Sequence, residues 1–70
     1  MFILYTQMSE SKDVEILKIG TKEECIEVAH DKFNPYYERL TLKEIEEELD
    51  NDTLSNFNTQ EYEVYKLREV

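Results

Sequence analysis

The sequence predicts an α+β fold with two layers, in which two amphipathic helices cover one face of a three-stranded, mainly antiparallel sheet. Three apolar runs, at residues 2–8, 13–19 and 61–70, follow the pattern of strands and place the elements in the order β-β-α-α-β. Between the second and third runs, the apolar spacing changes from two residues to about 3.6, the period of a helix. With 70 residues, the chain is expected to form one small domain, residues 1–70, around one core.

The first two strands are expected to pair as an antiparallel hairpin. Residues 2–8, FILYTQM, hold too many successive apolar and aromatic side chains for a strand wetted on one face, so they predict a central strand. The polar link SESK, residues 9–12, is short enough to join antiparallel neighbours. In the second strand, residues 13–19, the apolar side chains change face, which predicts a bulge or a twist near its end. Val14 and Ile16 are expected on one face of this strand, and Leu17 and Ile19 on the other.

Residues 22–33 are expected to form the first helix. Thr21 and Glu24 have the spacing of a capping box, in which each side chain accepts a hydrogen bond from the other residue's backbone amide. The dipeptide Asn34-Pro35 predicts the end of this helix, because proline cannot extend the hydrogen-bond ladder. Its expected apolar side consists of Cys25, Ile26, Ala29 and Phe33, with Val28 at the edge.

The second helix is expected to start in the acidic stretch TLKEIEEELDND, residues 41–52. Thr41 and Glu44 repeat the capping-box spacing, and Leu40 can pack on Ile45 as a hydrophobic staple. The expected apolar stripe is Leu42, Ile45 and Leu49. The acids expected on the outer face are Glu44, Glu47 and Glu48, with Glu46 on a flank.

Residues 51–60, NDTLSNFNTQ, are polar and predict a loop, from which Phe57 is expected to fold back over the core. Residues 61–70, EYEVYKLREV, then predict the last strand. The side chains expected on its two faces are Tyr62 and Val64 on one, and Tyr65 and Leu67 on the other. The ten-residue connection allows this strand to run in either direction beside residues 2–8.

The charge distribution bears most directly on function. The chain carries 17 acids and 8 bases, a net charge of −9, and residues 21–52 alone carry −7. Such a negative field repels nucleic-acid phosphates, so direct binding of DNA or RNA is disfavoured, whereas a basic protein surface is attracted. The single cysteine excludes an internal disulfide and fits a reducing cytoplasmic setting. The apolar run within residues 1–8, MFILYTQM, is too short to span a membrane.

Catalytic and metal-binding patterns are weak, so neither an enzyme nor a cofactor is expected. Cys25 and His30 are five residues apart on a helix and point in different directions, which is a poor geometry for a nucleophile and its base. Glu27 and His30 have the spacing of one carboxylate–histidine pair of the metal sites in helical bundles, but such a site needs a second pair, which the sequence lacks. Residues 50–61 resemble a calcium loop, but Leu54 and Ser55 stand where an oxygen ligand and the turn glycine belong.

The remaining pattern, two acidic helix faces, indicates a partner-binding surface. Tyr36 and Tyr37, beside those faces, could supply the aromatic contacts that charge alone does not. The full expected set is Glu23, Glu24, Glu27, Asp31, Tyr36, Tyr37, Glu44, Glu47 and Glu48. The alternative is that these acids only make the protein soluble.

In composition, with one alanine, one glycine and no tryptophan, the chain resembles the small acidic proteins encoded by bacterial viruses and mobile elements. This resemblance implies an inhibitor of a host nucleic-acid enzyme, acting as a nucleic-acid mimic on a basic groove. Two alternatives are a homodimer or larger homo-oligomer, joined through an exposed strand edge, and, ranked last, a small metal-binding domain or enzyme.

Overall fold

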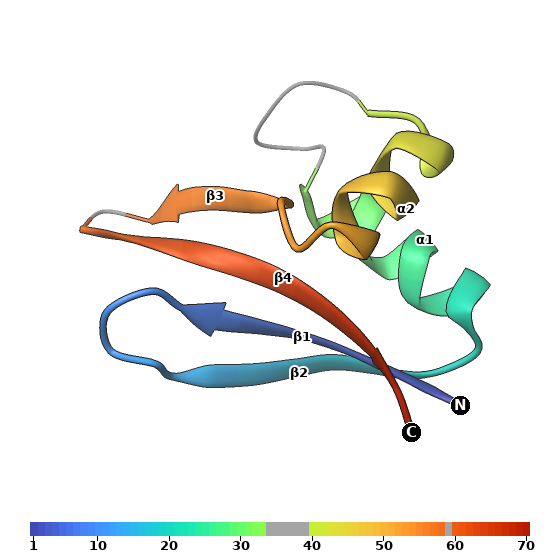
Figure 1. The fold of residues 1–70 in the computed structure, drawn as a ribbon, viewed down its shortest axis with the longest axis horizontal. Coiled ribbons are helices and arrows are strands. Elements are labelled where there is room, and N and C mark those ends of the chain that lie inside the picture. The colour runs from blue at the N-terminus through green and yellow to red at the C-terminus, as the bar shows by residue number, and fades with distance from the viewer. Residues whose placement is uncertain (34–39, 59) are drawn as a thin grey trace.

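The computed structural model describes residues 1–33, 40–58 and 60–70 and shows an α+β fold with a helical layer on a four-stranded antiparallel sheet (Figure 1). The elements in chain order are β1 (Phe2–Met8), β2 (Val14–Gly20), α1 (Lys22–Phe33), α2 (Leu42–Asp50), β3 (Ser55–Asn58) and β4 (Glu61–Glu69). The strand order in the sheet is β2-β1-β4-β3. Both helices lie over the same face, with α1 packed against β1 and β2 and α2 against β4.

The prediction of three strands was wrong, because part of the expected loop at 51–60 forms β3. Residues 55–58 pair with residues 61–64 of β4 in an antiparallel register. A short strand at the sheet's edge needs only backbone partners, so its polar sequence gave no apolar alternation to detect. The expected central position of residues 2–8 is confirmed, since β1 lies between β2 and β4, and β4 runs antiparallel to it.

The β1–β2 hairpin contains the predicted bulge, but the bulge changes the face of one residue. Leu4 pairs with Lys18 and Tyr5 pairs with Ile16, which leaves Leu17 as the extra residue. Leu17 packs against the core, on the face opposite Val14 and Ile16. Ile19, however, pairs with Ile3 on the face away from the helices, so its expected placement beside Leu17 was wrong. A bulge adds one residue to the alternation, and every later side chain therefore returns to the opposite face.

The core lies between the sheet and the helices and largely follows the sequence pattern. The predicted side of α1 and the strand residues Tyr65 and Leu67 are buried, as are Ile45 and Leu49 of α2. Leu42 is 48% exposed, so the expected stripe of α2 is only two-thirds buried. Leu54, from the expected loop, is 1% exposed and belongs to the core. Phe57 does not cover the core: it lies 54% exposed against Tyr62, with ring centroids 5.3 Å apart.

Both predicted capping boxes are confirmed by their hydrogen bonds. The Glu24 amide donates to Thr21 Oγ1 at 3.1 Å and the Thr21 amide donates to Glu24 Oε1 at 2.9 Å. At α2, the corresponding distances between Thr41 and Glu44 are 3.1 and 2.8 Å. The predicted stop at residues 34–35 lies outside the described residues.

Candidate functional site: an acid-rimmed groove between the helices

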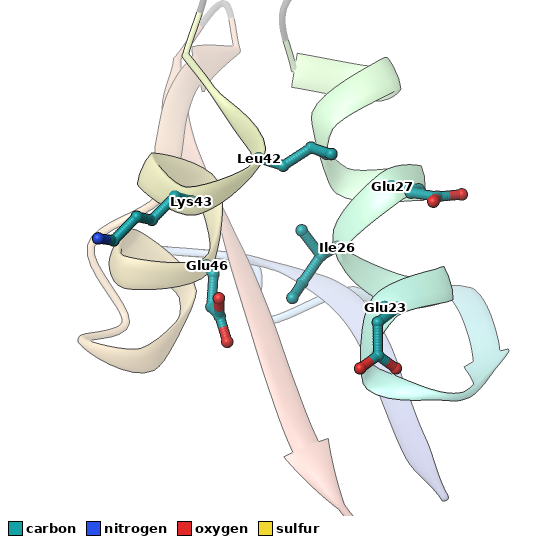
Figure 2. A pocket seen from close by; sticks show the side chains of 6 residues that line it. All are labelled: Glu23, Ile26, Glu27, Leu42, Lys43 and Glu46. Atoms are coloured by element: carbon teal, nitrogen blue, oxygen red, sulfur yellow. The ribbon is translucent and has the colours of Figure 1, made fainter.

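A groove runs between α1 and α2 and is lined by three residues from each helix (Figure 2). The six are Glu23, Ile26 and Glu27 of α1, and Leu42, Lys43 and Glu46 of α2. In Figure 2, Ile26 and Leu42 point into the space between the helices and form an apolar floor. Glu27 and Lys43 project outward on opposite sides, and Glu23 and Glu46 extend toward the same end.

The helix period explains why these residues meet. Glu23, Ile26 and Glu27 are separated by three and four positions, the spacing that places side chains on one side of a helix. Glu46 lies four residues after Leu42, so both occupy the side of α2 that faces α1. Burial of Ile45 and Leu49 sets the rotation of α2 on the sheet, and this rotation turns Glu46 toward the groove.

One cation links the two walls of the groove. Lys22 Nζ lies 3.3 Å from Glu46 Oε2 and 3.5 Å from Asp50 Oδ1, so the lysine at the start of α1 bridges to the second half of α2. The hydrogen bond with Glu46 is the main reason that the pKa of Lys22 is raised. The Lys22 ammonium therefore offsets part of the negative charge at this end of the groove, while Glu23 and Glu27 make no ion pair within the described part of the chain.

Of the nine residues predicted to bind a partner, Glu23 and Glu27 line the groove. Glu24 and Glu44 serve as caps, and backbone hydrogen bonds from Thr21 and Thr41 hold the pKa of each carboxyl below its ordinary value. Asp31 lies beside His30, with 3.3 Å between its Oδ1 and the ring Nδ1.

On α2, none of the three predicted acids lines the groove. Glu44 and Glu48 are each two positions from Glu46, a turn of about 200° around the helix, so they point away from α1. Glu48 Oε2 accepts a hydrogen bond from Thr53 Oγ1 at 2.8 Å, and Glu47 is exposed. Tyr36 and Tyr37 lie outside the described residues. The groove thus brings together two of the predicted acids, Glu23 and Glu27, with Glu46.

Sequence reasoning missed Ile26 and Leu42 as a groove floor and placed Glu46 only on a flank. The available signal was the spacing of Leu42 and Glu46, which are one helical turn apart. That spacing identifies a shared side of α2, but only the packing of α2 beside α1 shows that this side lines a groove.

The three carboxylates that resembled a calcium loop have protein partners instead. Asp50 contacts Lys22, and Glu61 Oε1 accepts hydrogen bonds from the amides of Glu10 and Ser11 at 2.8 and 3.0 Å. Asp52 binds both terminal nitrogens of Arg68 at 3.0 Å each. Across residues 1–33, 40–58 and 60–70, no three metal-ligating side chains of His, Cys, Asp or Glu gather into a metal-holding group.

Cys25 is part of the packing. Its side chain is fully buried, with Sγ 3.8 Å from the Phe2 carbonyl oxygen and 3.9 Å from that of Lys18. Burial raises the pKa of the thiol, which disfavours the reactive thiolate. The prediction that this cysteine is a small buried hydrophobic residue is confirmed.

Neither described helix is long and apolar enough to cross a membrane. No protein-family model, curated protein or solved structure matched the chain in the three comparisons with known proteins.

Proposed function

We propose that this chain is a small, acidic, non-enzymatic interaction protein that binds a basic segment of another protein in the groove between α1 and α2. The observation that carries the proposal is the combination of an apolar floor, Ile26 and Leu42, with the rim carboxylates of Glu23, Glu27 and Glu46. An amphipathic segment with an apolar anchor flanked by lysine or arginine has the complementary pattern.

The floor and the rim have different roles in this proposal. Leu42 is 48% exposed in the free protein, so a partner's apolar side chain that covers it would remove apolar surface from water. Glu23 and Glu27, which make no ion pair among the described residues, are available to a partner's cations. The net charge of −9 would speed the encounter, and the groove would set the orientation.

This function is consistent with an inhibitor that occupies the basic surface a nucleic-acid enzyme uses to hold phosphates. The net charge of −7 that is gathered in residues 21–52 supports the role of nucleic-acid mimic. The compositional resemblance to small proteins of bacterial viruses supports it as well. In this role the protein binds the enzyme and not the nucleic acid, because its own field repels phosphates.

The test compares two double variants with the same net charge. In one, Glu23→Gln and Glu27→Gln remove groove charges. In the control, Glu15→Gln and Glu69→Gln remove two exposed charges from the sheet, outside the groove. Binding of a fluorescent, amphipathic lysine–leucine peptide is followed by anisotropy at about 0.05 M and about 0.5 M salt, which differ strongly in screening.

The groove variant should bind more weakly than the control and lose less affinity as salt is added. Exposed ion pairs contribute about 0.2–1 kcal/mol each, so loss of two predicts a roughly 2- to 30-fold weaker complex. Equal weakening by both double variants would show that net charge, and not the groove, attracts the peptide. Leu42→Ser should also weaken binding, in this case with little change in salt dependence.

A further inference from the structure

We propose that a second copy of this chain covers the open face of the sheet, the face opposite the helices, so that two sheets pack face to face with their helical layers outside. This inference concerns the side of the molecule away from the groove and does not depend on the function proposed for the groove.

The open face is unusually apolar for a surface in contact with water. Five large apolar side chains on it are each at least half exposed: Val14 56%, Ile16 59%, Ile19 50%, Phe57 54% and Tyr62 54%. Cross-strand pairing joins most of them to half-buried neighbours, since Ile16 lies opposite Tyr5 and Ile19 opposite Ile3. We call Ile3, Tyr5, Val14, Ile16 and Ile19 the β2-side patch. Contiguous apolar surface of this kind typically marks an interaction site.

Among the surfaces of this acidic chain, the open face is the one on which charge opposes a second copy least. Within the four described strands, no acid stands at a position whose side chain shares the open face, and the charged residues there are Lys66 and Arg68. Two molecules of charge −9 repel each other. Contact through the open faces keeps the two acidic helical layers farthest apart, so it costs the least repulsion of any pairing.

The two cations do not prevent this arrangement. Lys66 pairs with Tyr5 and Arg68 with Ile3, so both belong to β4 and lie beside the β2-side patch, not within it. Arg68 is already neutralised by its two-point contact with Asp52. The long aliphatic stem of Lys66 allows its ammonium to reach water at the rim of the contact when the two faces meet.

Pairing through strand edges is less favoured than pairing through the faces. The edge of β2 is interrupted by the bulge at Leu17, and β3 at the other edge has four residues. Bulges and short strands are devices that block edge-to-edge pairing. The apolar open face has no comparable protection.

The area of the face predicts a weak dimer. Strands of seven, seven, four and nine residues, at about 3.3 Å per residue and about 4.8 Å apart, give a face of roughly 430 Å² per copy. A pair would bury about 860 Å², which is below the area of a standard interface and in the range of weak, transient contacts. We therefore expect a dissociation constant in the micromolar range.

Sedimentation equilibrium of the full chain, from about 5 µM to about 1 mM, tests the proposal across the affinity expected for an interface of this size. The unmodified protein should convert from monomer to dimer and go no further. Ile16→Lys, in the centre of the patch, should weaken the dimer by about tenfold or more. Leu42→Lys, a similar change at a similarly exposed position on the helical layer, is the matched control and should not.

Three results would overturn the proposal. One is a monomer at every concentration, and another is assembly beyond two copies, which would indicate head-to-tail contact. The third is equal weakening by Ile16→Lys and Leu42→Lys. Circular dichroism confirms that each variant is folded, and Val14→Lys replaces Ile16→Lys if that variant is not. Added salt should strengthen the dimer by screening its like charges, whereas it should weaken peptide binding in the groove, so the two proposals fail independently.

Discussion

Replacement of Leu54 by alanine provides the sharpest test of the fold. Leu54 lies in a polar segment that resembles a loop, yet it is 1% exposed and its carbonyl accepts a hydrogen bond from the Tyr65 amide at 2.8 Å. Leu→Ala at a buried site usually costs about 2–5 kcal/mol, from lost burial and the cavity left behind. For 70 residues, a total stability of about 0.05–0.15 kcal/mol per residue is typical, or roughly 3.5–10 kcal/mol.

Leu54→Ala should therefore remove a large fraction of the stability of the domain. At about 4–8 °C per kcal/mol for a domain of this size, the melting temperature should fall by at least about 8 °C. Urea and thermal unfolding can be followed by circular dichroism and by tyrosine fluorescence, since the chain has five tyrosines and no tryptophan.

Leu42→Ala is the matched control, because it deletes the same atoms from a side chain that is 48% exposed. It should change stability by less than about 1 kcal/mol, since alanine is also favourable within an exposed helix. If the two variants lose equal stability, or if Leu54→Ala is neutral, then Leu54 does not fill the core and the segment is the loop that its composition predicts.

Three further predictions concern caps, acid and the thiol. Thr41→Ala should cost about 1 kcal/mol in urea unfolding, whereas Thr41→Ser, which keeps the hydroxyl, should not; equal losses would contradict the cap. The Arg68 guanidinium holds the pKa of Asp52 below its ordinary value of 3.8, so their contact stabilises the fold fully above that pH and is lost as the pH falls through the lowered pKa. The small stability difference between Arg68→Gln and the unmodified protein should accordingly be present at neutral pH and shrink in acid, and a difference that persists at low pH would exclude this origin. Cys25 should react with iodoacetamide much more slowly in the native protein than in urea, because burial both shields the thiol and raises its pKa, and similar rates would show that it is accessible.

The two proposed surfaces lie on opposite sides of the molecule and differ in chemistry. The groove between the helices combines a small apolar floor with carboxylates, whereas the open face is broad and mainly apolar, and its charged strand residues are Lys66 and Arg68. A dimer formed through the open faces would leave both grooves exposed, so each copy could still bind a basic partner. The two binding events would then increase avidity for a partner with repeated basic segments.

Local patterns in the sequence determined the elements whose formation depends on near neighbours. The threonine–glutamate spacings at Thr21 and Thr41 specify both helix starts, and the apolar spacing specifies the buried side of α1. The alternation in residues 61–69 likewise identifies the buried face of β4, because the period of a strand is two. Glu23 and Glu27 of the candidate site could be found in this way.

Contacts between distant segments decided the rest. β3 exists because β4 supplies its backbone hydrogen bonds, and Ile19 faces away from the helices because the register with β1 places the bulge at Leu17. Glu46 joins the groove, and Glu44 and Glu48 do not, because burial of Ile45 and Leu49 fixes the rotation of α2. The sequence alone determined which side chains share a side of an element, while only the tertiary structure decided what each side meets, since that depends on register and packing across the chain.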